Sequence, residues 1–171
     1  TGVQTCALPI CHALYTPIEG MLKAKEMKIN RDVLNVVEDS RIERKIKYKY
    51  PGLKNSFVKA YKELLQKDFF SIEGTDINKM NLIDRINLHC KGGAQLRIRF
   101  SEEERFLLDE VETTETYEDV IDVSKKIIEY MKQQLEQEKE KRQKSKSDEP
   151  DELEDSEEDE IGDNFDDSEY E

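Results

Sequence analysis

Apolar residues recur at three- and four-residue spacing over most of residues 11–144, which predicts a mainly α-helical protein. The clearest such segment is residues 31–49, where Asn30 is placed to cap the first turn and Pro51-Gly52 ends the helix. One stripe of this helix is expected to be buried, and it contains Val33, Leu34, Val37, Ile42 and Ile46.

Five more segments are distinguished: residues 18–28, which are either a connection or a short helix, and residues 55–68, 76–90, 101–111 and 117–144, which have helical spacing and are bounded by capping residues, Pro or Gly. Thr75 or Asp76 is expected to cap the third of them, and Ser101 with Glu104 forms a capping box for the fourth. Residues 95–100 alternate apolar and polar positions, a pattern typical of a short strand or an extended linker. The buried face of the 55–68 helix is expected to hold Phe57, Val58, Tyr61, Leu64 and Leu65.

Both ends of the chain differ in composition from its middle. Residues 1–10, TGVQTCALPI, contain no charged residue in a protein that is 39% charged, and they resemble a translated sequencing adaptor. We therefore expect them to be non-native, and residues 11–144 to be a helical domain truncated at its N-terminus. Residues 145–171 are predicted to be a disordered acidic linker or tail, because their hydrophobicity is low and their acidic residues repel one another.

The net charge of −13 comes from this tail. Residues 148–171 contain 15 acidic and no basic residues, which leaves +2 for residues 1–147. A nearly neutral folded part argues against nucleic-acid binding, and the absence of an apolar run of ~20 residues argues against a membrane span. The three cysteines form no disulfide framework, so a reducing, cytoplasmic location is expected. The tail itself is either a linker between domains or a surface for a basic protein partner.

Glu38 lies on the apolar stripe of the 31–49 helix, between Leu34 and Ile42. A carboxylate that faces a core is costly unless a cation, a metal or several donors compensate its charge. The sequence leaves two explanations open. Glu38 forms a buried salt bridge with an arginine such as Arg41 or Arg85, or it binds a metal ion together with His12.

Two short stretches favour the metal. CHALYTP at residues 11–17 and NVVEDSRIE at residues 35–43 resemble the metallopeptidase domain that precedes von Willebrand A domains in cobaltochelatase T-subunit-like proteins, many of them encoded by phages. The resemblance covers about residues 11–145. It implies a zincin-like helical fold, a zinc cofactor and an HExxH helix followed by an acidic third ligand. It matches His12 to the second histidine of that motif, Glu38 to the third ligand, and Asp39 to an acid that orients a metal-bound imidazole.

The sequence departs from this family at positions 8 and 9. Leu8 and Pro9 stand where the first histidine and the catalytic glutamate of HExxH are expected, and a proline there is predicted to disrupt the helix. Only two metal ligands and no general base remain, so no catalytic residue is assigned. The chain is therefore interpreted as an inactive fragment of a zinc-dependent peptidase-like protein, or of a metal-site scaffold for which the resemblance implies an AAA+ ATPase partner. The alternative is a non-catalytic helical interaction module with an acidic linker, a partner of an AAA+ ATPase and von Willebrand A system, in which Glu38 is salt-bridged.

A four-ligand structural zinc site made by Cys11-His12 and His89-Cys90 is a weaker alternative. Adjacent residues on a helix point about 100° apart, so both members of such a pair seldom reach one metal ion.

Overall fold

The computed structural model describes the backbone of residues 2–147 and the side chains of residues 9–143, and within these ranges it contains helices and no strand. The prediction of a mainly helical chain with a long C-terminal helix is confirmed. The α-helices are α1 (Gly2–Tyr15), α2 (Ile18–Glu26), α3 (Arg31–Lys49), α4 (Leu53–Gln66), α5 (Leu82–Gly92), α6 (Glu102–Thr113) and α7 (Tyr117–Ser147). Two 3₁₀ turns, η1 (Ile77–Lys79) and η2 (Gly93–Leu96), flank α5.

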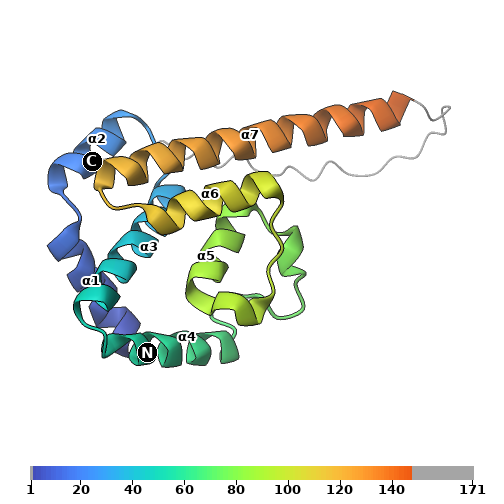
Figure 1. Cartoon of the computed structure of the whole chain (residues 1–171). Coiled ribbons are helices and arrows are strands. Elements are labelled where there is room, and N and C mark those ends of the chain that lie inside the picture. Colours follow the sequence, from blue (N-terminus) through green and yellow to red (C-terminus); the bar gives the residue numbers. More distant parts are fainter. Residues whose placement is uncertain (1, 148–171) are drawn as a thin grey trace, which may run out of the picture. The chain divides into compact units, whose positions relative to one another are not determined.

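Helix α3 is the central element, since it packs against α1, α4, α5 and α6 (Figure 1). Its first turn is capped as predicted, because the Asn30 side chain accepts hydrogen bonds from the backbone N–H groups of Asp32 and Val33. The two ends of its apolar stripe serve two different clusters. Val33 and Val37 pack with residues of α5, α6 and α7, whereas Ile42 and Ile46 pack with α1 and α4.

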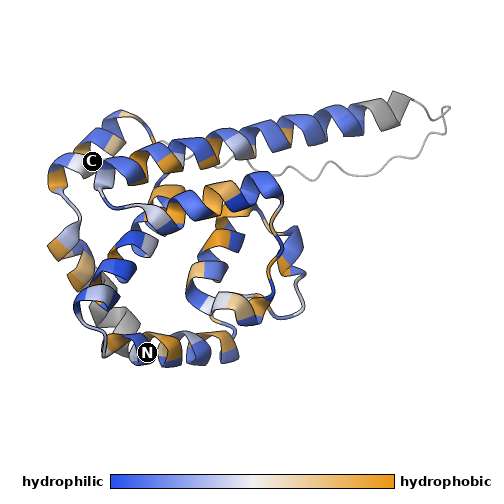
Figure 2. Ribbon diagram, viewed as in Figure 1, coloured by the Kyte–Doolittle hydropathy of each residue, from blue (hydrophilic) through white to orange (hydrophobic). Residues whose placement is uncertain are grey.

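The first half of α7 covers α2 and part of the main core. Tyr117 and Ile121 form a small buried cluster with Ala24 of α2. The approach is close at Gly20, where an added Cβ would lie 2.3 Å from the Tyr117 ring, so only glycine fits. Apolar residues become sparse toward the C-terminal half of α7 (Figure 2), and Leu135 in that half is 56% exposed.

Several predicted details are wrong. The 76–90 segment is interrupted, because Asp76 caps only η1, the chain is extended at Met80, and Asn81 caps α5 through the backbone N–H of Asp84. Val58 is 66% exposed because α4 buries Phe57, Ala60, Tyr61 and Leu64 instead. Residues 95–100 were expected to be a short strand or an extended linker. They do not form a strand: the segment starts in η2 and continues as extended chain.

By its contacts, the chain divides into residues 1–136 and residues 137–171. Of the predicted disordered tail, residues 145–147 belong to α7, and residues 148–171 lie outside the described part of the chain. None of the helices described has the length and apolar character needed to cross a bilayer.

Candidate metal centre

Helix α1 carries the histidine that sequence analysis assigned to a metal. The helix continues through Pro9 to Tyr15, so the prediction that proline disrupts it is wrong. Proline removes one backbone hydrogen bond and crowds the preceding turn. The Pro9 ring is exposed, and α1 packs against both α3 and α4, so tertiary packing offsets that local cost. Positions 8 and 12 therefore lie on one continuous helix.

Glu38 of α3 is 2% exposed, and both of its oxygens accept hydrogen bonds. The Arg41 guanidinium binds it as a fork, with Nε 2.7 Å from Oε2 and Nη2 2.7 Å from Oε1. The Thr16 hydroxyl donates a third hydrogen bond to Oε1 at 2.5 Å. Of the two explanations left open by the sequence, the structure contains the buried salt bridge, with Arg41 as the partner. Arg85 pairs with Glu104 instead.

Arg41 connects three parts of the chain through this pair. Besides Glu38, its guanidinium donates to the backbone carbonyl of Tyr15 at 2.9 Å and to that of Glu115 at 3.2 Å. The Tyr15 carbonyl lies at the end of α1, where helical carbonyls lack a partner within the helix. The Glu38–Arg41 pair thus joins α3 to the end of α1 and to the loop between α6 and α7.

His12 lies beside this pair and contacts two acceptors. Its Nδ1 is 3.1 Å from Thr16 Oγ1, and its Nε2 is 3.0 Å from Asp39 Oδ1. The Thr16 hydroxyl proton is directed to Glu38, so Nδ1 must donate, and a carboxylate accepts only, so Nε2 must donate as well. A ring that donates from both nitrogens is an imidazolium. Accordingly, the hydrogen bond to Asp39 raises the pKa of His12, against the smaller opposing effect of burial.

Asp39 contacts the His12 ring through its Oδ1 atom. Its second oxygen, Oδ2, lies 3.4 Å from Lys91 Nζ of α5. Ligands of a tetrahedral zinc ion at ~2.0–2.1 Å from the metal lie about 3.3 Å apart, which is close to the His12–Asp39 separation. If Nε2 lost its proton, His12 and Asp39 would have the spacing of two zinc ligands. Glu38, in contrast, has both oxygens held by Arg41 and Thr16.

The described residues do not fit a complete zinc site. A catalytic zinc takes three protein ligands, and in the part of the chain with described side chains no group of three or more His, Cys, Asp or Glu is arranged to hold a metal.

The weaker four-ligand alternative is not supported by the positions of its residues. Cys11 is 1% exposed and packs in the apolar cluster around Ile42 and Phe57, on a different side of α1 from His12. His89 lies 3.3 Å from Glu112 and packs edge-on against Phe100. Adjacent residues on α1 and on α5 point to different surroundings, as helix geometry requires.

Two members of this network, Thr16 and Lys91, were not identified from sequence. Thr16 bridges His12 and Glu38, and its position before Pro17 in the sequence indicates only the end of a helix. Lys91 is 52 residues from Asp39 in sequence, and no local pattern links them. A search of family models, curated proteins and solved structures finds no match to this chain.

Proposed function

We propose that residues 11–144 belong to a zincin-like metal-binding domain that is catalytically inactive in this chain. The supporting observation is that His12 on α1 meets the acidic residues of α3, with Asp39 at 3.0 Å and Glu38 reached through Thr16. These are the two stretches on which the resemblance to zinc-dependent peptidases rests, and they lie side by side. Leu8 and Pro9 supply neither a ligand nor a general base, so peptide hydrolysis is not expected.

The proposal is tested by restoring the two missing groups. In the double variant Leu8→His/Pro9→Glu, the two histidines lie four residues apart on α1 and share one helix face. We expect this variant to bind one equivalent of zinc at pH 7.5 with a dissociation constant below about 1 μM, measured by calorimetry and metal analysis. The unchanged chain is expected to bind zinc at least about a hundredfold more weakly, because it lacks one ligand.

The control adds His12→Ala to the restored variant and is expected to abolish zinc binding. Asp39→Asn and Glu38→Gln, each added to the restored variant, show which acid is the third ligand. The proposal fails if the restored variant folds with unchanged helix content and binds no zinc, or if zinc binding is insensitive to His12→Ala.

A second candidate function is a helical interaction module, and a separate observation favours it. Large apolar side chains on α1 and α2 are more than half exposed: Ile10, Leu14, Ile18, Met21 and Leu22. Exposed apolar groups of this size, spaced along two consecutive helices, are typical of surfaces that contact other proteins. In this case Glu38 serves only to hold α1 against α3, and the partner is an AAA+ ATPase or a basic protein. Failure of zinc binding in the restored variant would favour this candidate.

A further inference from the structure

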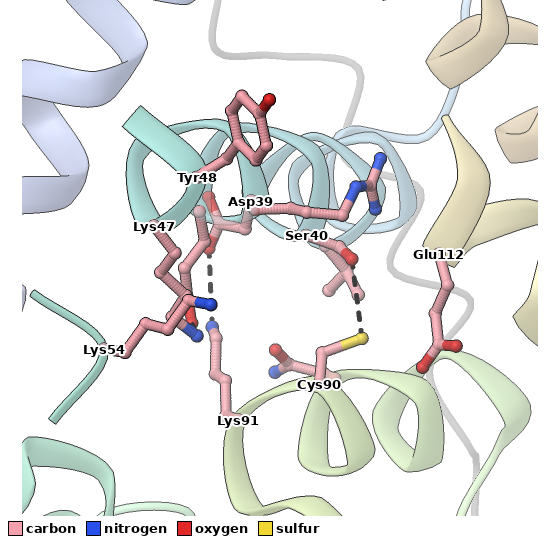
Figure 3. A pocket seen from close by; sticks show the side chains of 12 residues that line it. Asp39, Ser40, Lys47, Tyr48, Lys54, Cys90, Lys91 and Glu112 are labelled. Carbon is pink, nitrogen blue, oxygen red and sulfur yellow. Dashed lines mark hydrogen bonds and ion pairs between the residues drawn. The ribbon is translucent and has the colours of Figure 1, made fainter. Parts of the chain in front are cut away.

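A cavity of about 430 Å³ lies between α3 and α5 (Figure 3). Its α3 wall consists of Val36 and three pairs of adjacent residues spaced one helical turn apart, from Asp39-Ser40 to Lys47-Tyr48, and its α5 wall includes Asn87 and Cys90. Lys54 of α4 and Glu112 of α6 also line it. This volume falls within the range of small-ligand sites, which is about 300–1,000 Å³.

The cavity carries an excess of positive charge. Its lining contains four cationic and three anionic side chains. Three of the cations are lysines from three different helices, namely Lys47, Lys54 and Lys91. Lys47 pairs with Glu43 and Lys91 with Asp39. Lys54 makes no ion pair within the described part of the chain, and Arg44 donates to the oxygens of Val111 and Thr114 rather than to a carboxylate. The third anion, Glu112, lies 3.3 Å from His89. The lining therefore has a net excess of one positive charge.

Asn87 supplies a second, independent indication of a ligand. Its Oδ1 atom is buried and has no hydrogen-bond partner among the described residues. A buried acceptor without a donor is costly, and most such atoms in folded proteins are satisfied. A ligand that donates an N–H group into the cavity would remove this cost. A water molecule would also satisfy Asn87, but it would leave the excess positive charge uncompensated.

We propose that this cavity binds the carboxyl-terminal end of a peptide. The carboxylate lies against Lys54, with Lys47 and Lys91 beside it, and a backbone N–H of the peptide donates to Asn87 Oδ1. A carboxylate carries a single negative charge, which matches the net charge of the lining, and the peptide bond next to it supplies an N–H donor for Asn87 Oδ1. The inference goes beyond zinc binding and does not depend on it, although Asp39 forms part of the cavity and also contacts His12.

The test uses the unchanged chain without zinc and two small probes, N-acetyl-alanyl-alanine and its C-terminal amide. Binding is followed by amide chemical shifts in NMR titrations. We expect the acid to shift the signals of Lys54, Asn87 and Lys91 with a dissociation constant of about 1 mM, as for a small ligand. The amide is expected to bind at least about tenfold more weakly, because it lacks the charged acceptor.

Two variants locate the interaction. Lys54→Glu is expected to weaken binding of the acid by at least about fivefold, whereas Lys62→Glu, on the same helix but away from the cavity, leaves it unchanged. Asn87→Leu removes the proposed acceptor and is expected to weaken binding without lowering the free energy of unfolding, because the Oδ1 atom has no partner to lose.

Three results would overturn the proposal: equal binding of the acid and the amide, no shifts up to about 20 mM of the acid, or displacement of the acid by an equal concentration of inorganic phosphate. The last result would make the cavity a general anion site. All of these titrations are carried out without zinc, so none of their results bears on the metal-binding proposal.

Discussion

At the scale of single residues, Glu38 and Arg41 are the pair on which the arrangement of α1 and α3 depends. Both side chains are 3% exposed. Breaking a buried ion pair by removing one partner leaves an uncompensated buried charge and costs about 3–5 kcal/mol. We therefore expect Glu38→Gln and Arg41→Met each to lower the free energy of unfolding by roughly that amount, measured by urea unfolding.

The double variant Glu38→Gln/Arg41→Met is the control. It removes both charges, so its loss of stability should be smaller than the sum of the single losses by about 2 kcal/mol or more. Part of the Arg41 effect remains in the double variant, because the Tyr15 and Glu115 carbonyls still lose their donor. Additive losses, or single losses below about 1 kcal/mol, would contradict a buried and coupled pair.

The candidate site could be predicted in part at this scale. The position of Glu38 on an apolar stripe correctly predicted a buried carboxylate that needs a partner, and Arg41 was one of the named arginines. Helical spacing alone could not decide between Arg41 and a metal, because both compensate a buried charge. Thr16 and Lys91 reach the site through tertiary packing, which a pattern along the chain does not contain.

At the scale of helices, α5 and α6 are joined by a second buried ion pair. Arg85 Nη1 lies 3.0 Å from Glu104 Oε2, and Nη2 pairs with the other oxygen. Arg85 also donates to the backbone carbonyls of Met80 and Arg99. Glu104 in turn completes the capping box of α6 by accepting from the Ser101 N–H at 2.9 Å. One carboxylate therefore both starts α6 and attaches it to α5.

The decrease in the free energy of unfolding at acid pH should depend on Glu104. Burial acts to raise its pKa, but hydrogen bonds from Arg85 and the Ser101 backbone outweigh burial, so its pKa lies below the ordinary 4.5. A lowered folded-state pKa means that Glu104 stabilises the protein above pH 4.5 and loses this effect as the pH falls through its folded-state value. We expect Glu104→Gln to cost about 1.5–3 kcal/mol at pH 7, measured by urea unfolding, and progressively less in acid.

Glu103→Gln is the matched control for this prediction. Glu103 also lies in the first turn of α6, so its substitution removes the same favourable interaction with the helix dipole, but its side chain is exposed. Its loss should stay below about 0.5 kcal/mol at every pH. Equal losses in the two variants would attribute the effect to the helix dipole and contradict a role for the pair with Arg85.

Helices were predicted from sequence more accurately than their boundaries. The 3.6-residue period of the apolar positions identified α3 and α7, and the Ser101–Glu104 spacing identified the start of α6. The break before α5 was missed because Ile77 and Met80 continue the apolar spacing across it. What ends that segment is the extended backbone at Met80 and the Asn81 cap, and Asn81 lies inside the pattern, where a cap is not expected.

At the scale of the whole molecule, charge and stability are carried by different parts of the chain. Residues 137–171 contain 17 acidic and 5 basic residues, a net charge of −12, which leaves −1 of the total of −13 for residues 1–136. The buried apolar residues of α7 end at Ile127, and every side chain described from Leu135 to Gln143 is exposed. Apolar burial is the main source of stability in a folded protein, so residues 137–171 should contribute little to it.

Removing residues 137–171 should therefore leave the thermal midpoint within about 2 °C of the full chain, since 1 kcal/mol corresponds to roughly 4 °C for a domain of this size. The shortened protein should be less soluble, because its net charge is close to zero. A control that ends at Asp122 also removes Val123 and Ile127, which are 7% and 0% exposed, and should unfold. The thermal midpoints of the full chain and of both shortened chains are measured by circular dichroism at low and at high salt concentration. A fall of more than about 5 °C on removal of residues 137–171 would mean that this part of the chain stabilises the helical core through contacts other than apolar burial.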